Sequence, residues 1–180
     1  GANLESLMPV FMKHGSKGIK PEIKKLQDAL LRVRYAQVPV VGAIRGIALG
    51  GGNEIAVHCA RRVAAMESYM GLVEVGVGLL PGGGGCKEFA LRAAQESRGD
   101  VLAALKDYFM AIATAKVGTS ALEGQAIGYL KKTDTVVFNV HELLYVAKQE
   151  ALAMAEAAHR QALTGAAEKV AAVCVAVVGE

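Results

Sequence analysis

The sequence predicts an α/β domain in which glycine turns join strands to helices. The β-branched stretch VPVVGAI at 38–44 reads as a buried strand; Gly50–Gly52 and an apolar helix at 53–60 follow it. A second short strand at Arg62–Ala65 is followed by a loop that reaches the glycine run Gly82–Gly85. The repeated order of strand, glycine turn and helix favours crossover connections. A length of 180 residues with 53% apolar side chains suits about one domain with a substantial core.

The composition excludes several classes of protein. Glycine supplies 21 of 180 residues, and seven of these lie in the two runs Gly50–Gly52 and Gly82–Gly85. Collagen needs a strict three-residue period, and a flexible linker would lack the many Val, Leu and Ile residues. A net charge of +3 with high apolar content argues against disorder. The longest apolar run, at 170–178, is far shorter than the ~20 residues of a membrane span, so we expect none.

The remaining elements are predicted from caps and periodicity. A helix is expected from Pro21, with Ile23, Leu26, Leu30 and Val33 on one face. Further elements are expected as a helix from an Asp100 cap to about 115, a helix from a Thr119 or Ser120 cap to 127, a strand at 135–138 and a helix at 142–158. We find no internal sequence repeat and no linker.

The charge distribution and the cysteine content indicate which binding partners and which cellular compartment to expect. Seven basic residues against two acidic ones between Lys13 and Arg34 form either a solvated helix face or a landing patch for a phosphorylated ligand. No aromatic side chains interleave with them, so nucleic acid is not expected. Three widely spaced cysteines without a Cys/His cluster predict a reducing, cytoplasmic setting and no metal site.

The glycine runs point to backbone chemistry rather than nucleotide binding. Neither run has the spacing of a dinucleotide fingerprint or a phosphate loop. The N-terminus of the helix after Gly50–Gly52 offers free N–H donors that can hold a developing oxyanion. Glu54 follows this turn, and Glu74 lies twenty residues later. Taken alone, an acidic residue in a first helical turn is also explained by the helix dipole.

Together these features resemble the crotonase superfamily of enoyl-CoA hydratases and isomerases. The stretches PVVGAIRGIALGGGNEIAVHCARRVAA and GLVEVGVGLLPGGGG are similar to its signature, the opening GANL to its first oxyanion segment, and TSALEGQAIGYL to a later segment. The resemblance covers residues 1 to about 158 and is strongest to the hydratase modules of bifunctional fatty-acid-oxidation proteins. It implies a spiral of ββα units followed by C-terminal helices, with the N-terminal strands of the family missing before Gly1. We therefore expect a partial core at 1–141 and a C-terminal helical segment at 142–180.

The resemblance also implies the site. Its backbone N–H donors to the thioester oxygen would be Ala2 and Gly51, its catalytic carboxylates Glu54 and Glu74, its donor near the reacting water Gly82, and its substrate-channel residues Asn3 and Leu4. Asn3 stands where the family usually has Asp. Cys86 is expected to be a buried structural thiol and His58 a satisfied core or interface histidine.

The implied reaction is addition of water to a trans-2-enoyl-CoA, which gives a 3-hydroxyacyl-CoA. CoA belongs to the substrate, so no separate cofactor is expected. Two carboxylates can divide the two proton transfers of this reaction. The alternatives are an enoyl-CoA isomerase, which needs one acidic residue, and a non-catalytic structural module. The family also implies homotrimers or hexamers and a fused or partner 3-hydroxyacyl-CoA dehydrogenase.

Overall fold

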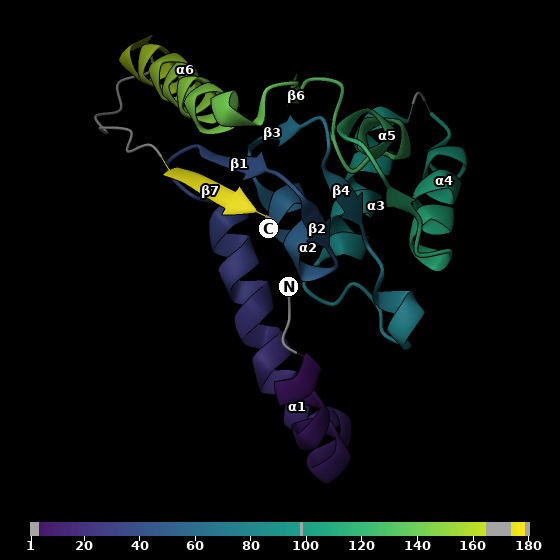
Figure 1. Cartoon of the computed structure of the whole chain (residues 1–180). Helices are drawn as coiled ribbons and strands as arrows, with labels where there is room; N and C mark the ends of the chain where they lie inside the picture. Colours follow the sequence, from purple (N-terminus) through teal and green to yellow (C-terminus); the bar gives the residue numbers. More distant parts are fainter. Residues whose placement is uncertain (1–3, 98, 165–173, 179–180) are drawn as a thin grey trace.

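The computed structural model describes residues 4–97, 99–164 and 174–178, which form two sheets and the helices that cover them (Figure 1). The helices are α1 (Leu4–Arg34), α2 (Gly51–His58), α3 (Gly85–Glu96), α4 (Val101–Ala113), α5 (Ala121–Ile127) and α6 (Leu143–Thr164), with the short 3₁₀ helices η1 (Glu74–Val77) and η2 (Val140–Glu142). The strands are β1 (Val40–Ile44), β2 (Ile47–Leu49), β3 (Arg61–Ala65), β4 (Tyr69–Gly71), β5 (Val117–Gly118), β6 (Thr135–Val137) and β7 (Cys174–Val178).

The strands stack as successive turns of a spiral. β1, β2 and α2 make one turn, and β3, β4 and α3 make the next. β1 pairs in parallel with β3, and β2 pairs in parallel with β4. The first strands of the units lie in a parallel sheet of order β6-β3-β1-β7, and the second strands lie in the sheet β2-β4-β5. The ββα units therefore repeat in space although the sequence shows no repeat.

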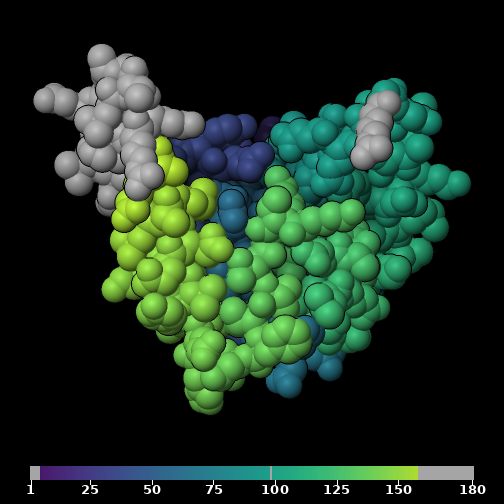
Figure 2. Space-filling view, turned by 90° about the horizontal axis from the view of Figure 1, so that it is seen from above, coloured from purple at the N-terminus to yellow at the C-terminus, as the bar shows by residue number. Residues whose placement is uncertain are grey.

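The larger sheet is covered on both faces, as its apolar strands require. All five residues of β1 are buried. Val41 and Ala43 face α6, where Ala147 and Ala151 lie one turn apart and allow close approach. Ile44 belongs instead to the core shared with α2, α3, α4 and α5. Figure 2 shows α6 on the left of one face, α3 and α4 on the right, and the chain between α5 and α6 spanning the centre.

The first helix is longer than the sequence predicts. A helix was expected from Pro21, whereas α1 begins at Leu4 and includes both Pro9 and Pro21. Its two halves meet at a kink at Gly15, where φ is 58°. α1 projects away from the sheets in Figure 1 and packs against α2. Gly15 is itself non-helical, so α1 consists of a segment before Gly15 that the sequence does not predict and a segment after it that contains the predicted helix.

Other elements agree with their predictions or differ in detail. Ser120 caps α5 by accepting the N–H of Glu123, and Asp100 caps α4 by accepting the N–H of Ala103. The predicted loop after β3 contains β4 and η1. The predicted helical segment at 142–180 is helical over Leu143–Thr164, but Cys174–Val178 form a strand beside β1, because three of these five residues are valine, which favours strands. No helix in the described ranges is both long enough and apolar enough to cross a bilayer.

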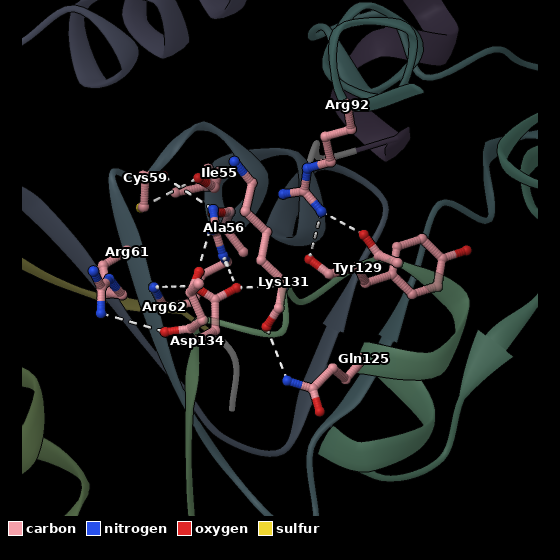
Figure 3. Close-up of polar contacts among 12 residues, drawn as sticks. Ile55, Ala56, Cys59, Arg61, Arg62, Arg92, Gln125, Tyr129, Lys131 and Asp134 are labelled. Atoms are coloured by element: carbon pink, nitrogen blue, oxygen red, sulfur yellow. Dashed lines mark hydrogen bonds and ion pairs between the residues drawn. The ribbon is translucent and has the colours of Figure 1, made fainter. Parts of the chain in front are cut away.

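A buried ion pair ties β3 to the segment before β6 (Figure 3). The Arg62 guanidinium donates from Nε to Asp134 Oδ2 at 2.6 Å and from a terminal nitrogen to Oδ1 at 3.0 Å. Its other terminal nitrogen donates to the Cys59 carbonyl at 3.0 Å, and Asp134 also accepts the N–H of Lys131 at 2.6 Å. Both side chains are almost fully buried, so each depends on its partner for solvation.

We expect Asp134→Ala to lower the free energy of unfolding by about 3–5 kcal/mol, because it leaves the Arg62 charge buried without its partner. The measurement is chemical denaturation followed by circular dichroism. Asp107→Ala, at an exposed position in α4, is the matched control and should change stability by no more than about 0.5 kcal/mol. Equal stabilities of the two variants would contradict this role for the ion pair.

Candidate active site

The first glycine run forms a turn that exposes the N-terminus of α2. β2 ends at Leu49, and Gly50 turns the chain with φ of 53°, a conformation that favours glycine. The Gly50 N–H donates to the Gly71 carbonyl at 2.8 Å, which fixes the turn to β4. Among the described residues no side chain caps the helix, so the N–H of Gly51 at its first position has no capping partner there. Such an N–H is the kind of donor that an oxyanion site uses, and this role of Gly51 stays a prediction.

Glu54 lies in the first turn of α2, where it is almost fully buried. Its Oε1 accepts the N–H of Gly85 at 3.0 Å, although the two residues are 31 positions apart in the sequence. Gly83 packs so tightly against the Glu54 carboxylate that a Cβ at that position would overlap Oε2. The second glycine run therefore holds and orients Glu54.

Glu74 is the first residue of η1 and is half-buried. Both of its carboxylate oxygens are buried, and neither has a hydrogen-bond partner in the described part of the chain. A Cβ on Gly50 would lie 3.5 Å from Glu74 Oε1, so the carboxylate rests against the first glycine turn. Burial, and then the charge of Glu54, raise the pKa of Glu74 above its ordinary value of 4.5.

The two carboxylates and the two glycine runs meet at one cavity of about 280 Å³. Gly50, Gly51, Glu54, Glu74, Gly82 and Gly83 line it together with leucine, isoleucine and valine side chains. α1 closes one side of this cavity with Leu7, Ile23 and Leu26. The arrangement offers backbone donors, two proton-transfer groups and an apolar surround in a single space.

Three predicted site residues lie at the start of the chain. Ala2 and Asn3 are outside the described residues. Leu4 is the first residue of α1, one turn before Leu7, and its proposed contact with substrate stays a prediction. Within the described ranges no group of three or more His, Cys, Asp or Glu side chains could hold a metal ion.

His58 lies one turn after Glu54 as a core residue with satisfied nitrogens, as predicted. Its Nδ1 donates to the Glu54 carbonyl at 2.7 Å, and its Nε2 lies 3.2 Å from Lys87 Nζ. Burial lowers the pKa of His58, which keeps the ring neutral and able to accept from Lys87. The Lys87 ammonium in turn pairs with Glu88 at 2.8 Å. His58, Lys87 and Glu88 thus connect the end of α2 to the start of α3.

The prediction for Cys86 is wrong in one respect. The residue is exposed rather than buried, in the first turn of α3. Partial burial and the charges of Glu54 and Glu74 raise the pKa of its thiol. A neutral thiol is a poor nucleophile, so Cys86 remains unsuited to covalent catalysis.

Sequence reasoning missed the residues that act across long sequence distances. The sequence marks Gly83 and Gly85 only as members of a glycine run, and it gives no role to Gln27. Gln27 Nε2 donates to the Gly82 carbonyl at 2.8 Å, and this bond fixes the second glycine run to α1. The only available signal was that Gln27 lies near the apolar face of a predicted helix beside Ile23 and Leu26.

The basic residues of α1 fit the solvated-face interpretation. Lys13, Lys17 and Lys20 are exposed, while Lys24 pairs with Asp28 and Lys25 with Glu22 on the helix surface. Exposed pairs at such spacings contribute little to stability. The alternative of a phosphorylated ligand stays a prediction.

The profile of the family described as "Enoyl-CoA hydratase/isomerase" matches residues 12–119, which include both glutamates and both glycine runs. The chain belongs to the enoyl-CoA hydratase/isomerase family. It is 41% identical over 154 residues to a probable 3-hydroxyacyl-CoA dehydrogenase of Bacillus subtilis, with 86% of this chain and 19% of that protein covered. It is 42% identical over 73 residues to the human mitochondrial methylglutaconyl-CoA hydratase, with 41% of this chain and 22% of that protein covered.

Solved structures with the crotonase fold superpose on this chain. An enoyl-CoA hydratase from Bacillus anthracis superposes with a TM-score of 0.64 at 28% identity and covers 81% of this chain and 50% of its own. Pseudomonas aeruginosa DspI superposes with a TM-score of 0.67 at 25% identity and covers 87% of this chain and 56% of its own. The predicted spiral of ββα units is therefore confirmed. The chain spans about a fifth of the curated relatives above and about half of these structures.

The raised pKa of Glu74 predicts a specific pH dependence of stability. Between pH 4.5 and the raised pKa the folded state binds more protons at Glu74 than the unfolded state does, so this group's contribution to stability falls as pH rises through that window. Glu74→Gln removes the titration. We expect the difference between the two melting temperatures, variant minus native, to increase as pH rises from below 4.5 to neutral. A constant difference across this range would contradict the burial-induced shift.

Proposed function

We propose that the chain hydrates a trans-2-enoyl-CoA to a 3-hydroxyacyl-CoA. The observation that carries the proposal is the single cavity lined by Glu54, Glu74 and the exposed N-terminus of α2 at Gly51. Membership of the hydratase/isomerase family and the names of the relatives support it.

The thioester oxygen binds at Gly51 N–H, with Ala2 N–H as the second donor. As water attacks C3, the electron pair of the C2–C3 double bond moves toward C1 and negative charge builds on that oxygen. Each preorganised donor to such a charge contributes about 2.7–4 kcal/mol to the transition state. The Gly82 segment adds a backbone donor near the reacting water.

The two glutamates divide the proton transfers. Glu54, oriented by the Gly85 N–H, takes a proton from the attacking water, and the resulting hydroxide oxygen bonds to C3. Glu74, whose pKa is raised by burial, delivers a proton to C2. Water is thereby added across the double bond. Exchange of one proton between the two carboxyl groups through solvent restores the starting state.

The relatives' names also support a proposal on partners. The Bacillus subtilis relative is named as a probable 3-hydroxyacyl-CoA dehydrogenase, and a Rickettsia felis relative is named as a putative fatty acid oxidation complex trifunctional enzyme. We propose that a dehydrogenase module, fused or separate, oxidises the product. A homotrimer or hexamer is proposed for the assembly, and light scattering would test it.

The experiment that tests the function is a hydration assay of the full chain with crotonyl-CoA, followed by loss of the conjugated-thioester absorbance. Steady turnover is expected. Migration of the double bond of a 3-enoyl-CoA without hydration would instead favour an isomerase. A folded chain with neither activity would favour a non-catalytic module.

A further inference from the structure

A second cavity, of about 380 Å³, lies between α3 and α4 and is lined almost entirely by apolar side chains. Phe89 and Ile112, both buried, belong to the hydrophobic core beneath it. Leu105 and Phe109 of α4 and Leu80 from the loop before α3 complete most of the wall. Such a volume with so few polar groups suits a hydrocarbon rather than a charged ligand.

This second cavity adjoins the candidate active site. Leu80 lines both cavities, so they meet at this side chain. That side chain is 72% exposed and can change rotamer without disturbing the core. Cys86 lines the second cavity and directly follows Gly85, whose N–H holds Glu54. An acyl chain that extends from Glu54 and Glu74 past Leu80 therefore enters the space between α3 and α4.

We propose that the cavity between α3 and α4 binds the tail of the acyl chain, and that the substrate class is unbranched 2-enoyl-CoAs longer than crotonyl-CoA. The proposal rests on the hydratase function proposed above and adds its chain-length preference. Burial of each additional methylene group contributes about 0.8 kcal/mol, or about fourfold in binding. Leu80 and Cys86 then contact the acyl chain where it enters this cavity, and Phe109 contacts it at the outer wall.

The test is the specificity constant kcat/KM for crotonyl-, hexenoyl-, octenoyl- and decenoyl-CoA with the full chain. We expect kcat/KM to rise by about fourfold per methylene until the cavity is filled. Phe109→Asp places a charge in the wall of the cavity, and Cys86→Phe places a larger side chain there. Each should lower the ratio of kcat/KM for decenoyl-CoA over crotonyl-CoA by about tenfold or more.

Phe138→Asp is the matched control, because Phe138 is 83% exposed and lines neither cavity. The ratio of kcat/KM for decenoyl-CoA over crotonyl-CoA in this variant should stay within about twofold of the native value. If Cys86→Phe fails to fold, Phe109→Asp still decides, since Phe109 is already 62% exposed.

The outcomes separate the two proposals. Hydration of crotonyl-CoA with no gain for longer chains, or unchanged ratios in the folded cavity variants, would overturn the chain-length proposal alone. Absence of hydration at every chain length would overturn the proposed function. In that case, calorimetric binding of decanoyl-CoA against butyryl-CoA still tests the cavity: tighter binding of decanoyl-CoA, weakened by Phe109→Asp, supports it, and equal binding overturns it.

Discussion

Glu74→Gln is expected to lower kcat for hydration of crotonyl-CoA by about 10²–10⁴-fold, and Glu54→Gln by a similar factor. Glutamine preserves the size of each side chain but can neither take nor deliver the proton that the reaction moves. Glu74 has no hydrogen-bond partner among the described residues, so its replacement breaks no structural contact there. Stopped-flow or steady-state assays on purified, folded variants would measure the loss.

Two controls make this result specific. Glu67→Gln changes a carboxylate at an exposed position outside the cavity and should leave kcat within about twofold of the native value. The double variant should be little slower than the slower single variant, because groups that act as a unit are not additive. Full activity in either single variant would remove the two-carboxylate mechanism and favour isomerase-type chemistry.

Gly83→Ala is expected to lower kcat by about 10²-fold, although alanine carries no reactive group. Its Cβ would overlap Glu54 Oε2 and would also lie 3.0 Å from Leu30, which is buried on α1. The Glu54 carboxylate must therefore move, and a displacement of about 1 Å can reduce a rate by this factor. The expected pattern is a fall in kcat with a smaller change in KM.

Gly76→Ala, in η1, is the matched control. No atom of the described residues lies within 4 Å of a Cβ built there, and the backbone has no left-handed conformation to strain. Its kcat should match the native value. If Gly83→Ala kept native kcat while folded, the tight approach of the second glycine run would have no part in orienting Glu54.

The sequence predicted those parts of the site that depend on local structure. Glu54 follows the glycine turn by a fixed number of residues, so a strand, a turn and a helix place it beside the Gly51 N–H without knowledge of the rest of the chain. The caps at Asp100 and Ser120 were predicted for the same reason.

Contacts between distant segments could not be predicted in the same way. The Gly85 N–H reaches Glu54 only because α3 returns beside α2, and Gln27 reaches Gly82 only because α1 packs against α2. The repeat of ββα units was hidden because equal backbone geometry does not require equal side chains. Cys86 was misjudged because the exposure of a residue in a first helical turn depends on how the whole helix packs.

The most direct test of the proposed reaction is hydration of crotonyl-CoA in isotopically labelled water, with the product analysed by mass spectrometry. The native chain should give 3-hydroxybutyryl-CoA that carries one labelled oxygen on C3, and Glu54→Gln should form this product at least about 10²-fold more slowly. A folded native chain that yields no labelled hydroxyl product, or a Glu54→Gln variant that forms it as fast as the native chain, would contradict the proposed reaction.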